Sequence, residues 1–141
     1  MAEAVAAQGP APILFTHFGE EWIRGSERCL LDLLTHIDRS RFRPRVWCNA
    51  ETMAREVRAL DVPADVSPFS ILFHWDPPRY AFAQWWRQVR QGQALVARHG
   101  IRLLHSNSAA PTQWLLPVAR SQRLPLVTHL HAPYVLRERI T

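Results

Sequence analysis

Residues 12–37 read PILFTHFGEEWIRGSERCLLDLLTHI, a short apolar run followed by a turn and an amphipathic segment. The nearly continuous apolar run at residues 12–18 is typical of a strand that is buried on both faces of a parallel sheet. Apolar side chains then recur at helical spacing across residues 26–37. They are Cys29, Leu30, Leu33, Leu34 and Ile37. This spacing predicts a helix that is capped by Ser26 and has the Cys29 thiol on its buried face.

The same alternation continues along the chain. Further strands are predicted at residues 45–48, 63–67, 102–105 and 126–130, and further helices at residues 52–60, 79–99 and 111–122. Gly100 is expected to end the helix at residues 79–99. Strands that alternate with helices form right-handed βαβ units, which place a parallel sheet between two layers of helices. The sequence therefore predicts a doubly wound α/β fold with strand order 3-2-1-4-5.

Length and composition narrow the class of protein. With 141 residues, 48% of them hydrophobic, the chain favours one domain, at residues 12–141, preceded by a flexible arm at residues 1–11. Two cysteines cannot form a disulfide framework. No apolar run approaches the roughly 18 residues that a membrane span needs, and the first residues lack the basic start of a secretory signal. A cytoplasmic location is therefore expected.

The positive charge of the chain comes from arginine alone. All 17 of the Lys and Arg residues are arginines, and the formal net charge is +5. Arginine binds phosphates and carboxylates bidentately, so anionic partners are expected, although a genomic base composition that replaces lysine by arginine would give the same count. The arginines are scattered rather than clustered in the sequence, which argues against nucleic acid as the partner.

Histidines and small polar residues follow three of the predicted strands. In an open doubly wound sheet, ligands bind beyond the carboxyl ends of the strands, at the point where the strand order reverses. The residues expected at this edge are His17, His105, Ser106, Asn107, His129 and His131. Such groups suit sugar hydroxyls, phosphates and proton transfer, although each histidine alone would also fit a tight turn as a structural residue. A metal site at His129 and His131 is disfavoured, because no carboxylate or cysteine ligand is near them in sequence.

The turn between the first strand and the first helix is the other candidate site. Gly25 at the helix start would let backbone amides approach a phosphate. Its distance of six residues from Gly19 does not fit a G-x-G-x-x-G fingerprint, and the absence of lysine excludes a P-loop. A dinucleotide-dependent dehydrogenase and a P-loop enzyme are therefore disfavoured.

Four segments of the chain together resemble the GT-B glycosyltransferases of family 4. Residues 24–34, RGSERCLLDLL, resemble the G-G-x-E-R-x-L-x-x-L segment of their first helix, and residues 42–48, FRPRVWC, match their F-x-P-x-V strand. Residues 102–108, RLLHSNS, resemble their I-x-H-x-N segment, and residues 124–134, LPLVTHLHAPY, their P-x-V-x-T-x-H strand. The resemblance extends over about residues 12–141.

The resemblance implies the Rossmann-like, acceptor-side N-terminal domain of a retaining hexosyltransferase that uses a nucleotide-sugar donor and no cofactor. The donor diphosphate would lie near Arg24, Gly25 and Ser26, with Arg24 standing where the family has a glycine. His131 would lie beside the transferred sugar as the catalytic residue. The residues expected to bind the acceptor or the sugar are His17, His105, Ser106, Asn107 and His129.

Family members also have a second Rossmann domain, which binds the nucleotide and carries an E-x7-E motif. The chain is expected to be an incomplete first domain, inactive without that second domain, whose acceptor is a glycan or is lipid-linked. Phe82, Trp85, Trp86 and Val89 form an apolar stripe beside arginines, which suits peripheral contact with the inner face of a membrane, although core packing is the more common reason for such a stripe.

Two other functions fit the sequence. One is a non-catalytic module with a Rossmann-like sheet that binds anions or nucleic acid. The other is a scaffold domain that docks a partner chain.

Overall fold

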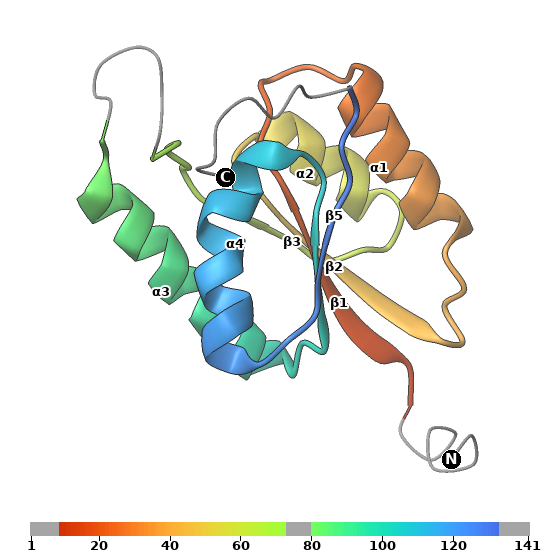
Figure 1. Ribbon diagram of the computed structural model, residues 1–141. Coiled ribbons are helices and arrows are strands. Elements are labelled where there is room, and N and C mark those ends of the chain that lie inside the picture. The colour runs from red at the N-terminus through yellow and green to blue at the C-terminus, as the bar shows by residue number, and fades with distance from the viewer. Residues whose placement is uncertain (1–8, 73–79, 133–141) are drawn as a thin grey trace.

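The computed structural model describes residues 9–72 and 80–132, which form a three-layer α/β domain (Figure 1). Its strands are β1 (Ala11–His17), β2 (Phe42–Cys48), β3 (Ala64–Val66), β4 (Leu103–Ser106) and β5 (Leu126–Thr128). They pair in parallel in the order β3-β2-β1-β4-β5. The predicted doubly wound sheet and its strand order are confirmed.

Two pairs of helices cover the two faces of the sheet. The helices are α1 (Gly25–His36), α2 (Glu51–Arg58), α3 (Phe82–His99) and α4 (Ala109–Gln122). Successive residues of a strand point to opposite faces, so Ile13 and Phe15 of β1 enter the core under α1 and α2. Leu14 enters the second core, under α3 and α4 (Figure 1). Burial on both faces explains the continuous apolar run of β1.

Several element ends differ from those predicted. Helix α1 begins at Gly25 and its N-cap is Arg24, so the prediction of Ser26 as the cap was wrong. Strand β1 already includes Ala11, while residues 1–8 of the predicted arm lie outside the described residues. Strand β5 ends at Thr128, so the histidines that follow it lie in the connection beyond the strand. Gly100 ends α3 in the left-handed conformation, with φ of 61°, as predicted.

The prediction that Cys29 is buried was also wrong, because its thiol is exposed. The buried face of α1 consists of Glu27, Leu30, Leu31 and Leu34. Each residue turns the helix by about 100°, so Cys29 points well away from this narrow face. Leu33 is likewise 38% exposed.

A hydrogen bond joins α3 to α4 beside a proline of α4. Pro117 has no N–H, so it cannot donate to the carbonyl of Gln113 four residues earlier. The indole Nε1–H of Trp85 on α3 donates to that carbonyl at 2.8 Å. Trp85 therefore faces α4.

Helix α3 also holds the segment that follows β3. The side-chain amide of Gln88, which is buried, accepts a hydrogen bond from the Ser70 N–H at 2.7 Å and donates to the Ser70 carbonyl at 3.1 Å. Residues 73–79, which include Arg79, the first residue of the helix predicted at residues 79–99, lie outside the described residues. Within the part of the chain that the structure describes, no helix is long and apolar enough to cross a membrane.

Candidate functional site

The candidate site lies at the carboxyl edge of the sheet, where β1, β4 and β5 end side by side. Backbone hydrogen bonds continue past the strand ends. The Asn107 N–H donates to the Thr16 carbonyl at 2.9 Å, and the His129 N–H donates to the Ser106 carbonyl at 2.8 Å. The strand order reverses between β1 and β4, so this edge is the switch point at which doubly wound folds bind ligands.

A buried pair of His17 and Glu27 forms the base of the site. His17 ends β1 and is 1% exposed, and Glu27 in the first turn of α1 is 3% exposed. Their atoms Nε2 and Oε1 are 2.9 Å apart. The other carboxylate oxygen of Glu27 accepts hydrogen bonds from the Arg24 N–H and the Ser26 hydroxyl, each at 3.1 Å. Glu27 thus ties the end of β1 to the start of α1.

The side chain of Asn107 connects this pair to the surface. Its Nδ2 lies 3.0 Å from His17 Nδ1 and 3.0 Å from the Ser26 carbonyl oxygen. A carbonyl oxygen can only accept, so the atom facing it must be the amide nitrogen, and that nitrogen donates to both neighbours. His17 Nδ1 is therefore an acceptor, and the proton of the ring is on Nε2, which donates to Glu27.

His131 packs on the opposite side of the Asn107 amide. Its Nε2 lies 3.0 Å from the Asn107 backbone oxygen and 3.2 Å from Oδ1. Both atoms are acceptors in this orientation of the amide, so His131 Nε2 carries a proton and Nδ1 is the atom left for another partner. The result is a continuous chain of hydrogen bonds from the Glu27 carboxylate through His17 and Asn107 to His131.

The pKa values of the buried pair fit this assignment. Burial lowers the pKa of His17 below its ordinary value, and the hydrogen bond that His17 donates to Glu27 opposes this only in part, so the ring is neutral near pH 7. Burial raises the pKa of Glu27, but hydrogen bonds from its own backbone, from His17 and from Arg24 lower it further than burial raises it. The carboxylate is ionised, and the site is a carboxylate beside a neutral imidazole.

Gly19 and Asn49 hold the turn against this pair. A Cβ on Gly19 would lie 2.6 Å from His17 Nε2 and 2.7 Å from Glu27 Oε1, so only glycine fits here without displacing them. The Gly19 N–H donates to Asn49 Oδ1 at 2.9 Å, and Asn49 Nδ2 donates to the Gly19 carbonyl at 2.8 Å. The end of β2 thereby fixes the turn that follows β1.

Three histidine rings lie next to one another along the edge, one pair tilted and the other edge-to-face. The centroids of His129 and His131 are 4.3 Å apart, and those of His105 and His129 are 6.2 Å apart. His105 lies against Phe15, with 4.8 Å between their centroids, and burial followed by the charge of His129 lowers its pKa to about 4. Among the residues that the structure describes, its Nδ1 has no hydrogen-bond partner. His129 is exposed and His131 half-buried, so these two form the surface of the site.

The predicted phosphate-binding residues lie on the exposed start of α1. Arg24 is exposed and its guanidinium stacks over Trp22, 4.1 Å from the ring centroid. Gly25 is the first residue of the helix, and a Cβ added there would meet nothing within 4 Å. The Ser26 hydroxyl is bound to Glu27. The fold itself therefore does not require a glycine at position 25.

The predicted site residues thus fall into two layers. Arg24, Gly25, His129 and His131 are accessible, whereas His17, Ser106 and Asn107 are buried and hydrogen-bonded beneath them. His105 is also buried, and Ser26 is half-buried. Within residues 9–72 and 80–132, no group of three or more His, Cys, Asp or Glu residues could hold a metal ion.

Sequence reasoning did not identify Glu27, Gly19 or Asn49 as site residues. In the sequence, Glu27 is simply an acidic residue in the first turn of a predicted helix. Its favourable interaction with the helix dipole is enough to explain its presence there. Its position three residues after Arg24, in the G-G-x-E-R-like segment, was the one available signal. Asn49 could not be found from local sequence, because its contact with Gly19 depends on the pairing of β1 with β2.

Fold and site together define a Rossmann-like α/β domain with an imidazole-rich ligand edge at its switch point. The family model of Glycosyltransferase Family 4 matches residues 23–140. The chain belongs to glycosyltransferase family 4.

Solved structures show the same fold. A glycosyltransferase from Rickettsia africae ESF-5 is 13% identical with a TM-score of 0.70, and the match covers 89% of this chain and 31% of that one. A protein from Listeria monocytogenes assigned as a UDP-N-acetylglucosamine 2-epimerase is 12% identical with a TM-score of 0.57. The match covers 86% of this chain and 31% of that one.

The C-terminal domain of a hydrogenase from Pyrococcus furiosus is 11% identical with a TM-score of 0.53, and the match covers 84% of this chain and 91% of that one. The comparison with curated proteins gives no match. The chain spans about a third of the length of the first two structures, so their similarity concerns one domain of each.

Proposed function

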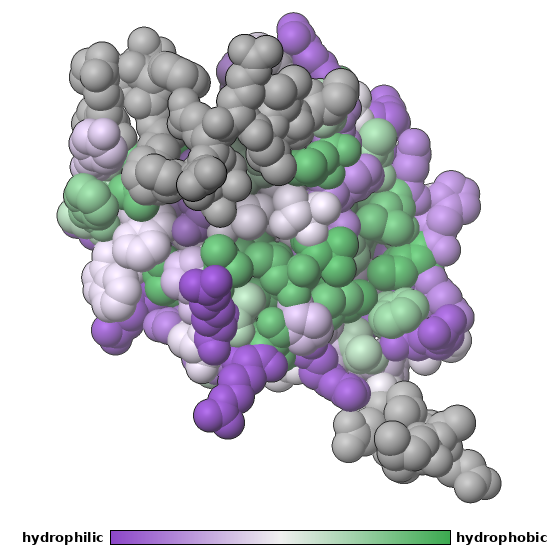
Figure 2. Space-filling model, viewed as in Figure 1, coloured by the Kyte–Doolittle hydropathy of each residue, from purple (hydrophilic) through white to green (hydrophobic). Residues whose placement is uncertain are grey.

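We propose that the chain is the acceptor-side N-terminal domain of a retaining, nucleotide-sugar-dependent hexosyltransferase that requires a second domain to act. Family membership and the 31% share of the Rickettsia glycosyltransferase support this proposal. So does the edge of the sheet at β5, where Val127 and Leu130 are each 47% exposed. Figure 2 shows apolar surface gathered over this edge. Such an edge is suited to be covered by further elements.

The start of α1 would bind the donor diphosphate. Arg24 offers a guanidinium, which binds phosphate oxygens bidentately, and the helix start adds partial positive charge. The open space at Gly25 allows a phosphate to approach the backbone at the first helical turn. Ser26 and Glu27 fix the geometry of this turn through the hydrogen bond between them.

His131 would act at the transferred sugar. The observation that carries this proposal is the fixed orientation of its ring, because Nε2 donates to Asn107 and Nδ1 is left to accept a hydrogen bond. A sugar hydroxyl is a donor that fits such an acceptor. His129 and His105 would extend the imidazole surface toward the sugar or the acceptor, and His17, Ser106 and Asn107 would support it from below.

The acceptor would be a glycan or a lipid-linked molecule at the membrane surface. Helix α3 supports a peripheral membrane contact, because Phe82 and Trp86 are 60% and 53% exposed and Arg87 and Arg90 lie near them on the helix. Aromatic rings with adjacent arginines suit the headgroup region of an anionic membrane.

Replacement of His131 tests the catalytic proposal. In the enzyme that contains both domains, His131→Ala should lower turnover by at least about 10²-fold, the usual scale for a positioned acid, base or hydrogen-bonding group. His36→Ala is the matched control, because His36 is exposed on α1 and bonds only the Asp32 carbonyl of its own helix, at 2.8 Å. A His131→Ala enzyme with the turnover of the control would refute the assignment.

A further inference from the structure

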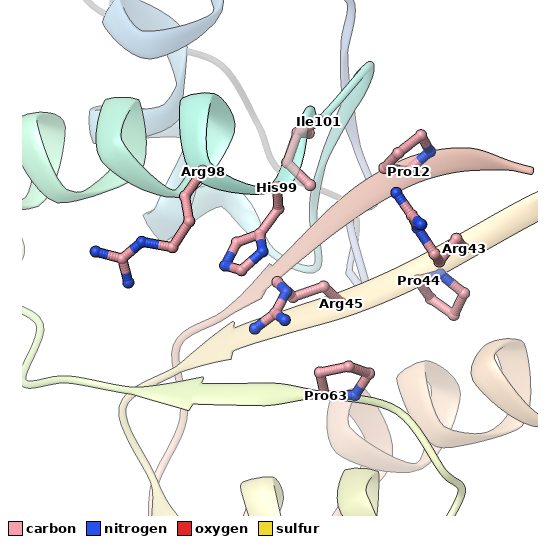
Figure 3. Close-up of a pocket in the computed structure, with 8 residues that line it drawn as sticks. All are labelled: Pro12, Arg43, Pro44, Arg45, Pro63, Arg98, His99 and Ile101. Carbon is pink, nitrogen blue, oxygen red and sulfur yellow. The ribbon is translucent and has the colours of Figure 1, made fainter.

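A cavity lies at the edge of the sheet opposite the candidate site, where the strands begin. It has a volume of about 310 Å³ and is lined by Pro12, Arg43, Pro44, Arg45, Pro63, Arg98, His99 and Ile101. Figure 3 shows the residues that line the cavity: Arg98 and His99 come from the end of α3, Arg43 and Arg45 come from β2, and in this view Arg98 and Arg43 lie on opposite sides of His99 and Arg45. Helix α3 runs antiparallel to the strands, so its last residues meet the first residues of β2 here.

This cavity is separate from the candidate sugar-transfer site. Pro12 and His17 lie five residues apart on the same strand, which corresponds to about 16 Å at 3.3 Å per residue. None of the residues predicted to bind the donor or the sugar lines the cavity. A ligand held there would not touch the reacting groups.

The charge of the cavity is strongly positive. Arg43, Arg45, Arg98 and His99 face it, and the carboxylate of Asp65 binds Arg45 at 2.7 Å. Among the described residues, no salt bridge is formed by Arg43 or Arg98. Desolvation and then the charge of Arg45 lower the pKa of His99, which shows that the imidazole lies within the field of the arginines. An anion in the cavity would relieve this repulsion.

The walls of the cavity are rigid. Three of the lining residues are prolines, whose φ is fixed, and two of these also pair their carbonyls with neighbouring strands or connections. The Val46 N–H donates to the Pro63 carbonyl at 2.9 Å, and the Arg102 N–H donates to the Pro12 carbonyl at 2.9 Å. The backbone of the cavity is therefore fixed before a ligand arrives, so the conformational entropy lost on binding is mainly that of the arginine side chains.

We propose that this cavity binds a phosphate-bearing ligand through the guanidinium groups of Arg43, Arg45 and Arg98. A guanidinium matches the geometry of phosphate oxygens, and three arginines that line one cavity favour a group with two negative charges over a single carboxylate. The volume is at the lower end of small-molecule sites and accommodates a phosphate with a small attached group. The phosphate belongs either to a soluble phosphate compound or to a lipid headgroup.

Titration of the full 141-residue chain with inorganic pyrophosphate tests the soluble source. In ¹H–¹⁵N correlation spectra, the amides of Arg45, His99 and Ile101 should shift saturably. The Arg43→Gln/Arg98→Gln variant should weaken this binding at least about tenfold, because it removes charge-assisted hydrogen bonds. The control is Arg55→Gln/Arg120→Gln, which removes the same charge from exposed positions outside the cavity.

Co-sedimentation with phosphatidylcholine vesicles that contain phosphatidic acid tests the lipid source. If the cavity takes a lipid headgroup, the Arg43→Gln/Arg98→Gln variant binds these vesicles less than the control variant does. The proposal is overturned if the two double variants behave alike with both pyrophosphate and vesicles. It is also overturned if pyrophosphate shifts only the amides of Gly25 and Ser26, since that result assigns the anion to the start of α1.

Discussion

Asn107 is the residue on which the order of the candidate site depends. Its backbone N–H continues the pairing of β4 with β1, and its amide nitrogen bonds His17 and the Ser26 carbonyl. Its backbone oxygen and its Oδ1 both accept hydrogen bonds from His131 Nε2. The amide of Asn107 has a fixed arrangement of donor and acceptor. It therefore determines which nitrogen of His17 carries the proton, and it supports the orientation of His131.

Substitution of Asn107 by aspartate should change the protonation of His17. An aspartate would present only acceptors to His17 Nδ1, so the ring, held between two carboxylates, should be protonated at both nitrogens at pH 7. In Asn107→Ala, Glu27 still accepts from Nε2, and His17 should keep a single proton. Long-range ¹H–¹⁵N spectra of the imidazoles distinguish these states. A singly protonated His17 in Asn107→Asp would contradict the assigned hydrogen-bond chain.

The two glycines of the first turn should respond differently to a side chain. Gly19→Ala forces a methyl group against His17 and Glu27. It should lower the free energy of unfolding, measured by urea denaturation, by about 2 kcal/mol. Gly25→Val has open space and should change stability by less than about 1 kcal/mol. In the enzyme with both domains, Gly25→Val should raise the KM for the donor. An unchanged KM would remove the support for phosphate binding at this turn.

At the scale of the element, α3 has two apolar faces with different roles. The sequence predicted one stripe of Phe82, Trp85, Trp86 and Val89. The structure divides it, because Val89 is buried in the core and Trp85 bonds α4, whereas Phe82 and Trp86 are exposed. Gln88, a polar residue of the same helix, is buried and bound to Ser70.

The exposed aromatic rings of α3 should mediate membrane contact. Vesicles that contain anionic lipid should co-sediment the chain at low salt and less of it at high salt, because the arginines contribute through screened charge. Phe82→Ala/Trp86→Ala should reduce binding several-fold. Leu33→Ala, a change at an exposed apolar residue of α1, should leave it unaltered. Equal loss in both variants, or no binding by the unmodified chain, would reject the membrane contact.

For the whole molecule, the buried histidines make stability depend on pH. His105 has an ordinary pKa of 6.5 when unfolded and about 4 when folded, so the unfolded state binds a proton first as the pH falls. The unfolding free energy should therefore be highest above pH 6.5 and should decrease toward pH 4. Integration over this window gives about 2 kcal/mol lost by pH 5. His17, whose pKa is also lowered, changes stability in the same direction.

Urea unfolding at pH 8 and pH 5 measures this effect. In His105→Phe, which keeps an aromatic ring against Phe15, the difference between the two pH values should be smaller by about 2 kcal/mol. His36→Ala, a change at an exposed histidine, should leave the difference unchanged. The same pH dependence in His105→Phe and the unmodified chain would show that His105 is not the buried group that titrates.

The sequence by itself determined the order of the elements and the edge that carries the histidines. Apolar runs alternating with helical stripes specify strands and helices locally, and the handedness of βαβ units then leaves few ways to order the sheet. The same rules predict that the ends of β1, β4 and β5 meet at one edge of the sheet. The resemblance of residues 24–34 to family 4 can also be recognised from sequence, because these residues form one continuous segment.

Only the tertiary structure decided which of these residues are buried and what they bond. The hydrogen bond of Asn107 to His17 joins residues 90 apart, and that of Asn49 to Gly19 joins residues 30 apart. The arginine-lined cavity likewise collects side chains from β2 and the end of α3. Periodicity reports which face of an element is apolar, but the partner of a polar group depends on packing between elements distant in sequence, which no local pattern contains.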